Sequence, residues 1–572
     1  MTASRAVLVL AALLGLWNLW GYDLWAPDEP YFAEGAREML ADGQWAVPHV
    51  NGTITTDKPP LFFWIIALLS LPAGRVTPLT ARLPSALAGL GSVVLAMRLA
   101  RRAAAAPGTA RLAPEAPAVS GEADAGLAGL VLATTHLHWD KARSAQIDAL
   151  LAFLILAALS AFVEFRAGRA AGRRSGLLFW GAAALAVLAK GPVGLLLPLG
   201  VALATLAWDR NLRAWRRFAP CAGPALFVMV VGAWMVLATA GGHGEYSVWG
   251  AFERHVLKRA VFGMHHVQPP WYYLQVLPVE LLPWSALVPG ALLLAWRRRG
   301  DPADRFLLAW AGFIVLFFSL STEKRDLYVL PACPAFALLV ARLVRATAWP
   351  AGAPAPAVRA PAGAASPPRT AGAGWVTVPL EIVATVLAAA GIAAPLLARR
   401  FASGLAQPAL AVGAVLVAAG GAILAAALAH RPLRAVLVTA AGASATYLVA
   451  VSLLYPALDP MNSARAFALE VRRATAGARA AGERVVSFGL GNLPEAIAFY
   501  SDGVYLQETA DPSRVAAHLE REAEAYAVAD AARLPELPPG LRERIIEVSA
   551  ADLNRKHVVL LRRRLGEREA AR

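Results

Sequence analysis

Seven carboxylates gather in one stretch near the start of the chain, between two apolar segments. They lie in residues 23–58, which hold two Lys or Arg side chains. The Pro-Asp-Glu run with Asp28 and Glu29 predicts the start of a helix that extends to about Leu40, with Asp28 as its cap. A carboxylate in a cavity can also act as a general base toward a hydroxyl group, or orient a sugar. Helix capping and catalysis are equally open from these residues alone.

Two further charged residues stand at the ends of apolar segments. Asp148 opens one such segment in the run KARSAQIDALL, and Lys190 lies between two others in LAKGPVGLL. A carboxylate that faced lipid would be costly, so Asp148 must meet either the water boundary or a cavity. Lys190 is open to the same two interpretations, as a boundary lysine in a Gly-Pro turn or as part of a site.

Cations and aromatic residues cluster in two later segments. Residues 240–273 contain Arg254 and Arg259 among histidine and aromatic residues, and the charged run 323–326 precedes another apolar segment. Arg and Lys are the usual protein partners of phosphate groups. An amphipathic surface helix over 252–261 is the alternative for the first of these segments. If they share a side with the carboxylates, the residues predict a site for a phosphate and a hydroxyl acceptor.

A metal site has weaker support. His49, Asp57, His265 and His266 could assemble one, but no two of them show a spacing dedicated to metal binding. We therefore predict that no cofactor is required, and keep a divalent metal at Asp57 and His266 as the alternative. The sequence contains no P-loop, no GxGxxG run followed by an acid, and no Ser-His-Asp order of a known hydrolase class.

The composition indicates an integral membrane protein. Of 572 residues, 58% are hydrophobic and 16% are charged, whereas an ordinary soluble domain has about 25% charged residues. The formal net charge of +15 comes largely from short loops between apolar runs, where basic residues set orientation, so it does not indicate nucleic-acid binding. The two cysteines lie in apolar segments and make no disulfide framework.

Thirteen segments are apolar and long enough to be plausible membrane spans. No small-x-small cleavage site follows the first, so we expect it to remain as a span. Residues 59–71 are apolar but too short to cross, which predicts an interfacial or re-entrant helix. The predicted spans are 5–22, 81–98, 125–139, 148–165, 176–189, 191–207, 220–239, 274–296, 305–320, 327–345, 376–397, 407–429 and 434–455.

The distribution of basic residues orients these spans. With 59–71 on the outer surface, most arginine clusters fall inside and the pair 399–400 falls outside, as the positive-inside preference favours. The N-terminus is then cytoplasmic, in a bacterial inner membrane. We predict a transmembrane domain over 1–455 and a periplasmic α/β domain over 456–572. Within the first, 23–72 and 240–273 are periplasmic loops and the Pro/Ala/Gly-rich 346–375 is a cytoplasmic linker.

Several blocks resemble a known family. LWAPDEPYFAEGAREMLADGQWAVPHVNG, followed by DKPPLFFW, resembles the first periplasmic loop of bacterial lipid A aminoarabinose transferases, which group with the protein O-mannosyltransferases among the GT-C glycosyltransferases. The resemblance continues in order through RSAQIDALLAF, LAKGPVGLLLP, QPPWYYLQVLPVELLPW and STEKRDLYVLPACPAFALL. It covers about residues 5–345.

The resemblance implies a polytopic α-helical membrane protein of GT-C type with a periplasmic cavity and a small C-terminal α/β domain. It also implies inverting transfer of a sugar from undecaprenyl or dolichyl phosphate. Asp28, paired with Glu29, matches the catalytic acidic position, Asp148 matches a second acid, and Lys58 matches a lysine at the carrier phosphate. The predicted carrier site is completed by Tyr272, Tyr273, Lys324, Arg325 and Tyr328 from the matching blocks, and by Arg254 and Arg259 from the basic loop.

Three positions depart from the aminoarabinose transferases. Pro30 stands where they have a small polar residue, Asp57 where they usually have Glu, and Arg-Asp-Leu-Tyr follows Lys324 in place of Leu-Pro-Thr-Tyr. The reaction class is unaffected by these changes. The sugar, a pentose or hexose with aminoarabinose among the candidates, and the acceptor, a lipid A-like lipid or a protein, remain open.

These residues together predict a single-displacement glycosyltransferase. The cations hold the carrier phosphate and offset charge on the leaving group. Asp28 accepts the proton of a hydroxyl acceptor or orients a phosphate acceptor, and Asp148 positions one of the substrates. A flippase or transporter of polyprenyl-linked lipid is the alternative, disfavoured because the spans show no paired halves. A non-catalytic lipid-binding protein would not need the two acids.

Overall fold

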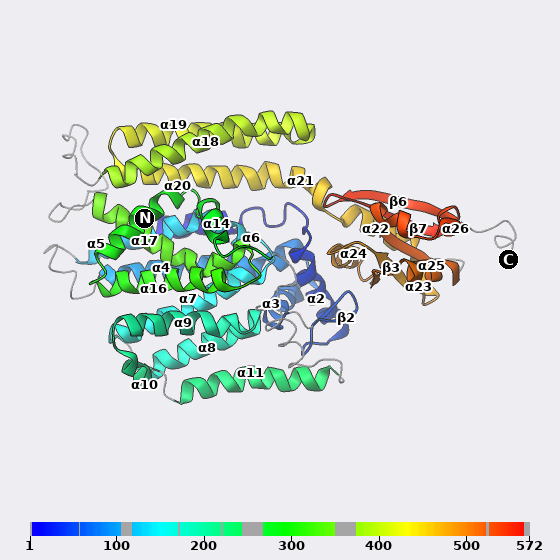
Figure 1. Cartoon of the computed structure of the whole chain (residues 1–572), viewed down its shortest axis with the longest axis horizontal. Coiled ribbons are helices and arrows are strands. Elements are labelled where there is room, and N and C mark those ends of the chain that lie inside the picture. Colours follow the sequence, from blue (N-terminus) through cyan, green and yellow to red (C-terminus); the bar gives the residue numbers. More distant parts are fainter. Residues whose placement is uncertain are drawn as a thin grey trace.

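The computed structural model describes residues 3–55, 58–104, 117–169, 172–218, 221–242, 267–348, 373–521 and 525–564. Apolar helices form an elongated bundle, and a small mixed sheet with its own helices stands at one end of it (Figure 1). The predicted fold class, a polytopic helical membrane protein with a C-terminal α/β domain, is confirmed.

The long helices lie side by side in the bundle, with α18 to α20 along one edge and α8, α9 and α11 along the other (Figure 1). Their apolar composition and length explain why they form, because a helix satisfies its own backbone hydrogen bonds in lipid. They are α1 (Ala3–Leu16), α4 (Pro78–Ala104), α5 (Pro117–Ala133), α7 (Ile147–Arg166), α8 (Gly172–Lys190), α9 (Val193–Trp208), α11 (Ala222–Gly241), α16 (Pro302–Leu320), α17 (Cys333–Ala348), α18 (Gly374–Phe401), α19 (Ala406–Leu428) and α20 (Pro432–Val449).

Among the described residues, eight helical segments are long and apolar enough to cross a membrane, or nine if one bent pair counts as a span. Each predicted span overlaps a helix, but two join helices that the structure separates. The span 125–139 is broken at Thr134, whose hydroxyl bonds back to Leu130 O, and α6 (His136–Arg143) follows separately. The span 274–296 is α14 (Tyr272–Glu280) and α15 (Val288–Arg297), which are bent by 120°.

The first helix also ends earlier than predicted. Asn18 has a φ of 58°, which breaks the helical path. The last carbonyls of the helix have no partner within it, and Arg143 on α6 binds them, donating to Leu14 O at 2.8 Å and to Trp17 O at 2.6 Å. A cation at these carbonyls is favoured by the negative end of the helix dipole. The predicted span 5–22 is therefore a 14-residue helix followed by a loop.

The two ends of the bundle differ chemically. At one end, which we call the basic end, Arg166 and Arg305 both pair with Asp209, at 2.6 and 2.8 Å. The helix α7 is 20 residues long, with Asp148 in its first turn and Arg166 as its last residue, so Asp148 lies roughly 30 Å away from the basic end. At the other end, which we call the α2 end, lie α2, α3 and the sheet domain (Figure 1).

The acid-rich loop folds into two helices and a hairpin at the α2 end. These are α2 (Asp28–Asp42), the strands β1 (His49–Val50) and β2 (Thr53–Ile54), and α3 (Leu61–Ser70). The predicted short helix in 59–71 is confirmed, and its ten residues extend about 15 Å, too little to span a bilayer. Its buried Phe62 and Phe63 pack on Phe32 of α2 with ring centroids 5.0 and 5.3 Å apart. The hydrophobic face thus fixes α2 in place.

The C-terminal domain holds a five-stranded sheet of order β4-β3-β5-β7-β6. The strands β3, β4 and β5 are parallel, and β7 joins β5 and β6 antiparallel. Helices α22 (Arg465–Ala474) and α24 (Pro494–Tyr500) cover one face, and α25 (Pro512–Arg521) covers the other. The strands are β3 (Val485–Phe488), β4 (Leu506–Thr509), β5 (Tyr526–Asp530), β6 (Ile545–Leu553) and β7 (Lys556–Arg563).

The sheet domain is hydrogen-bonded to the first loop. Asp459, in α21 (Tyr455–Asn462), accepts from the Trp25 indole at 2.7 Å and from the Asp23 amide at 3.0 Å. Asn51 pairs with the backbone of Leu506 through both ends of its amide, at 2.7 and 2.8 Å. The loop is therefore held between the bundle and the sheet domain.

Candidate active site

Asp28 is the first residue of α2, at the α2 end of the bundle. Its carboxylate accepts from Arg325 Nη2 at 2.9 Å and from Gln146 Nε2 at 2.8 Å, and its side chain is 25% exposed. The prediction that Asp28 caps the helix is wrong, because the cap position is Pro27 and no side chain caps the helix start. The helix dipole still stabilises a negative charge there. Asp28 is thus held by groups from two separate parts of the chain and remains accessible.

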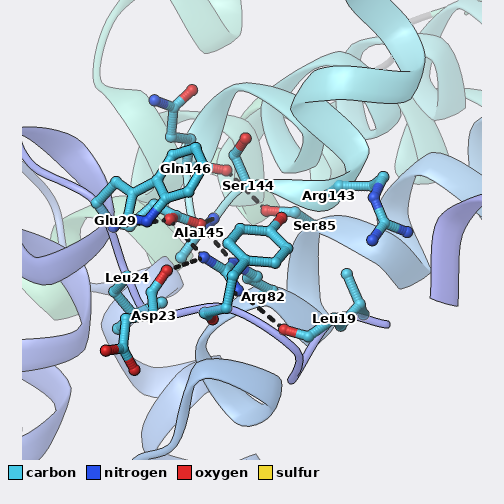
Figure 2. Close-up of polar contacts among 12 residues, drawn as sticks. Leu19, Asp23, Leu24, Glu29, Arg82, Ser85, Arg143, Ser144, Ala145 and Gln146 are labelled. Carbon is cyan, nitrogen blue, oxygen red and sulfur yellow. Dashed lines mark hydrogen bonds and ion pairs between the residues drawn. The ribbon is translucent and has the colours of Figure 1, made fainter. Parts of the chain in front are cut away.

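Glu29, the next residue, is buried and fully coordinated (Figure 2). Arg82 donates to its two oxygens at 2.7 Å each, and the amides of Ala145 and Trp25 donate at 2.9 and 3.1 Å. The remaining Arg82 donors bind backbone carbonyls of the loop before α2, so all five of its N–H groups are used. Glu29 therefore joins α2, α4 and the loop before α7, and it positions Asp28.

Asp148 forms an ion pair with Lys190, which joins the start of α7 to the end of α8. The Lys190 ammonium lies 4.9 Å from the ring centroid of Tyr328. Tyr328 belongs to the short helix η5 (Asp326–Ala332). Arg325, which binds Asp28, is the residue just before η5. Two predicted acids and two predicted cation or aromatic residues thus converge at one place, and Lys190 is part of the site.

Three other predicted carrier-site residues lie close by in different settings. Tyr273 is buried and its hydroxyl donates to Arg325 O at 3.1 Å, so it supports the backbone of that arginine. Tyr272 stacks edge-on against it, with ring centroids 5.2 Å apart. Lys324 is 3% exposed and its ammonium donates to Gln268 O and Ser321 O at 2.8 and 2.5 Å. The Lys324 charge is thus directed at backbone carbonyls, away from a substrate phosphate.

The remaining predictions are only partly located. Lys58 is half-buried just before α3, at the α2 end. Arg254, Arg259, Asp57 and His266 lie outside the described residues. Within the described part of the chain, no group of three or more His, Cys, Asp or Glu side chains could hold a metal ion.

Two site residues, Arg82 and Gln146, and the cation at the end of α1, Arg143, were missed from the sequence. Arg82 could have been found, because an arginine near the start of an apolar helix needs a buried partner. Arg143 carried the same signal in KARSAQIDALL. Gln146 had none, since a glutamine in a polar turn is ordinary. Its Nε2 bonds Asp28, and its buried Oε1 has no hydrogen-bond partner in the described structure.

Known proteins share both the sequence and the fold. The family model described as dolichyl-phosphate-mannose-protein mannosyltransferase matches residues 121–243. The undecaprenyl phosphate-alpha-4-amino-4-deoxy-L-arabinose arabinosyl transferase of Edwardsiella ictaluri is 32% identical over 342 residues, 59% of this chain and 58% of that one. The enzyme of the same name from Pseudomonas paraeruginosa is 32% identical over 340 residues, 58% of each chain. The crystal structure of ArnT from Cupriavidus metallidurans bound to undecaprenyl phosphate aligns with a TM-score of 0.75 over 97% of both chains, at 22% identity.

The chain has the fold of ArnT. Its relation to aminoarabinose transferases and O-mannosyltransferases, predicted from the first loop and the blocks after it, is confirmed by both sequence matches and by the fold. The chain is a multi-pass membrane protein, and its fold, including the C-terminal domain, aligns with 97% of the solved ArnT chain. The sequence match spans 58% of the length of the Edwardsiella transferase.

Proposed function

We propose that this protein is a glycosyltransferase that moves a sugar from a polyprenyl phosphate, undecaprenyl phosphate in particular, to an acceptor at the α2 end. The observation that carries the proposal is the placement of Asp28. Its carboxylate is accessible, is bound by Arg325 and Gln146, and is adjacent in sequence to the buried Glu29–Arg82 pair that fixes it. The named function of the relatives and the bound undecaprenyl phosphate in ArnT support the donor.

The reaction is a single displacement with inversion. An acceptor oxygen attacks the anomeric carbon, a new C–O bond forms, and the bond to the carrier phosphate breaks. The phosphate leaves with the electron pair as polyprenyl phosphate. Asp28 takes the proton when the acceptor is a hydroxyl. Gln146, whose Nε2 bonds Asp28, holds the carboxylate in line with that acceptor.

Arg325 has two roles in this scheme. In the structure it pairs with Asp28 at 2.9 Å, which fixes the carboxylate and occupies one of its two oxygens. The donor phosphodiester offers the guanidinium the same forked pair of oxygens as a carboxylate, and its negative charge grows as the bond to the sugar breaks, so it competes with Asp28 for Arg325. Donor binding would therefore draw Arg325 to the phosphate and release Asp28 for the acceptor. Lys58 would complete the phosphate contact, and Lys190 would hold the Asp148 carboxylate in place beside it.

The acceptor and the orientation are part of the proposal. The relatives favour aminoarabinose as the sugar and a lipid A-like lipid as the acceptor, with a protein acceptor as the alternative. The α2 end would face the periplasm of a bacterial inner membrane, because the arginines of the basic end would then lie in the cytoplasm. No cofactor is required in this scheme, and a divalent metal remains to be tested with chelator.

The test is transfer of labelled sugar from a panel of polyprenyl-phosphate donors by the purified protein, with a native membrane-lipid extract as the acceptor source. Wild type should label a product, and Asp28→Asn should lower turnover by about 10³-fold or more while still binding donor. Asp42→Asn is the matched control, since Asp42 lies at the exposed far end of the same helix. It should transfer at the wild-type rate.

Two outcomes would contradict the proposal. Equal transfer by Asp28→Asn and wild type would remove Asp28 from the mechanism. Failure of every donor, with labelled carrier crossing vesicles that contain the protein, would favour a flippase.

A further inference from the structure

The C-terminal domain contains a crevice that the proposed chemistry at Asp28 does not use. It lies where the parallel strands β3 and β4 end, and it is lined by Ser487, Gly489, Leu490, Gly491, Glu508, Thr509, Ala510 and Arg533. After β3 the chain turns to α24 and β4 on one side. After β5 it turns through η8 (Ala531–Glu536) toward β6 on the other side. Chains that diverge in this way leave a gap at the carboxyl ends of the strands, the usual place for a ligand in such sheets.

Glycines keep this gap open. Gly489 and Gly491 have φ values of 74° and 67°, which side-chain-bearing residues rarely adopt. A Cβ on Gly489 would stand 2.4 Å from Arg533 Cδ, so the arginine can lie against the turn. Lys556 Nζ donates to Gly489 O at 2.6 Å and ties the turn to β7. The result is a cavity of about 300 Å³, at the lower end of the roughly 300–1,000 Å³ of ligand pockets.

The polar groups of the crevice are arranged on rigid elements. Ser487 and Glu508 are direct partners in the parallel β3–β4 register, so their side chains stand next to each other on the same face. Arg533 is fixed on the opposite wall by two hydrogen bonds to Glu536, at 2.8 and 2.6 Å, and by the Phe488 ring 4.2 Å below it. A hydroxyl, a carboxylate, a guanidinium and peptide groups thus face one small volume.

The charge balance decides which ligand fits. Arg533 is neutralised by Glu536 at 2.6 Å, and Lys556 lies 3.3 Å from Asp530. Glu508 lines the crevice without an ion-pair partner among the described residues. The surplus charge is therefore negative, which disfavours a phosphate or another anion. Donors and acceptors at short spacing with a carboxylate suit a ligand rich in hydroxyl groups, or one that also carries an amino group.

We propose that this crevice binds one sugar unit of the acceptor. Glu508 accepts from the hydroxyl or amino groups of the sugar, Ser487 and the peptide groups of the glycine turn bond the others, and Arg533 donates from the far wall. The inference rests on the proposed function only in naming the acceptor as the source of the sugar. The site itself is a carbohydrate site of the C-terminal domain, separate from Asp28.

The test is a binding measurement on the full-length protein in nanodiscs, without donor. Saturation-transfer NMR titrations with arabinose, glucose, glucosamine and inorganic phosphate give the affinity of each probe. At least one of the sugars should bind saturably. Glu508→Gln should weaken it about tenfold, the scale of one hydrogen bond to a charged group. Ala510→Trp, which fills the mouth of the crevice, should abolish binding.

Glu547→Gln is the matched control, because Glu547 is an exposed carboxylate on β6 of the same sheet and lines no part of the crevice. It should bind as wild type does. Three results overturn the proposal: no sugar binds, phosphate binds more tightly than the sugars, or sugar binding is lost in Asp28→Asn and kept in Glu508→Gln. In transfer assays, Glu508→Gln should raise KM for the acceptor and leave KM for the donor unchanged. If wild type transfers no sugar while the titrations behave as expected, the proposed function fails and the carbohydrate site stands.

Discussion

Asp28 and Glu29 are neighbours with opposite environments. The contrast indicates that Asp28 can meet a substrate, whereas Glu29 holds the structure around it. Glu29 has four donors on its two oxygens and is 7% exposed, so it has no capacity left for a substrate. Asp28 has two donors, both on one oxygen, and faces the accessible side. In a sequence the two acids look alike, but only one of them is free to meet a substrate.

This contrast predicts different failures for the two amide variants. Glu29→Gln leaves the Arg82 charge buried without its partner, and loss of one member of a buried pair costs about 3–5 kcal/mol. The variant should therefore unfold at lower temperature and express poorly, whereas Asp28→Asn should unfold as wild type does. Thermal unfolding in detergent measures both. A stable, inactive Glu29→Gln protein would instead place Glu29 in the chemistry.

Arg325 allows a second prediction at this scale. If it passes from Asp28 to the donor phosphate, Arg325→Lys should keep the charge but lose the forked contact. The dissociation constant of undecaprenyl phosphate should then rise about tenfold. Arg298→Lys at the basic end of the bundle is the control and should bind as wild type does. Unchanged affinity in Arg325→Lys would remove this arginine from the phosphate site.

Residue type and predicted side of the membrane were enough to name most of the site residues. They did not predict which of these residues form ion pairs with each other. The convergence of Asp28, Asp148 and Arg325 follows from topology, since the predicted spans place all three on the same side of the membrane. The pairs Glu29–Arg82 and Asp148–Lys190 join residues 53 and 42 positions apart. Such pairs depend on how helices pack laterally, and a periodic apolar pattern does not record that.

At the scale of elements, α2 carries a second buried acidic group behind the site. Glu34 binds Arg37 at 2.7 Å, and the neighbouring Glu38 accepts from the amide of Gly52 at 3.1 Å. Burial, together with the charge of Glu34, raises the pKa of Glu38 to about 8. The hairpin β1–β2 is therefore held to α2 by a carboxyl group that is protonated at neutral pH.

This predicts a pH dependence of stability. The folded state binds the Glu38 proton more tightly than the unfolded chain, so its contribution is present at low pH and is lost as pH rises through about 8. Glu38→Gln removes that dependence. It should unfold like wild type near about pH 4, where both the folded and the unfolded states of wild type carry the proton, and should be more stable by on the order of 5 kcal/mol near about pH 9. Unfolding midpoints across this range, with Asp42→Asn as the control, measure it, and parallel curves would contradict it.

The sequence predicted helix ends correctly where the length of the apolar run sets them. It failed where a hydrogen bond from a distant residue to the backbone ends the helix. The spans at 148–165 and 407–429 are within a few residues of α7 and α19. The breaks after Leu16 and at Thr134 arise from Arg143 and from the bond between His136 N and Leu282 O at 2.9 Å. Both partners lie far away in the sequence, so the local apolar run extended through each break.

At the scale of the whole molecule, the sheet domain packs against the outer side of the first loop, residues 23–58. It contacts the loop at Asp459, Tyr500, Tyr505 and Leu506, on both sides of Asp28 in the sequence. The loop segment before α2 is thus fixed twice, by Arg82 from the bundle and by Asp459 from the domain. The sheet domain, which lies outside the part of the sequence that resembles the family, thus belongs to the same structural unit as the site.

The last prediction follows from that double attachment. Asp459→Ala removes the acceptor for the Trp25 indole and the Asp23 amide, while Arg82 still binds the Asp23 carbonyl. The amides of 23–25 should then exchange hydrogen about tenfold faster, with the bundle helices unchanged, and transfer should slow because the start of α2 is less well held. Asp552→Ala is the control, since Asp552 is exposed and pairs with His557 of its own domain at 2.8 Å. If exchange at 23–25 stays as slow as in wild type, Arg82 alone orders the loop, and the domain would act on the acceptor without positioning Asp28.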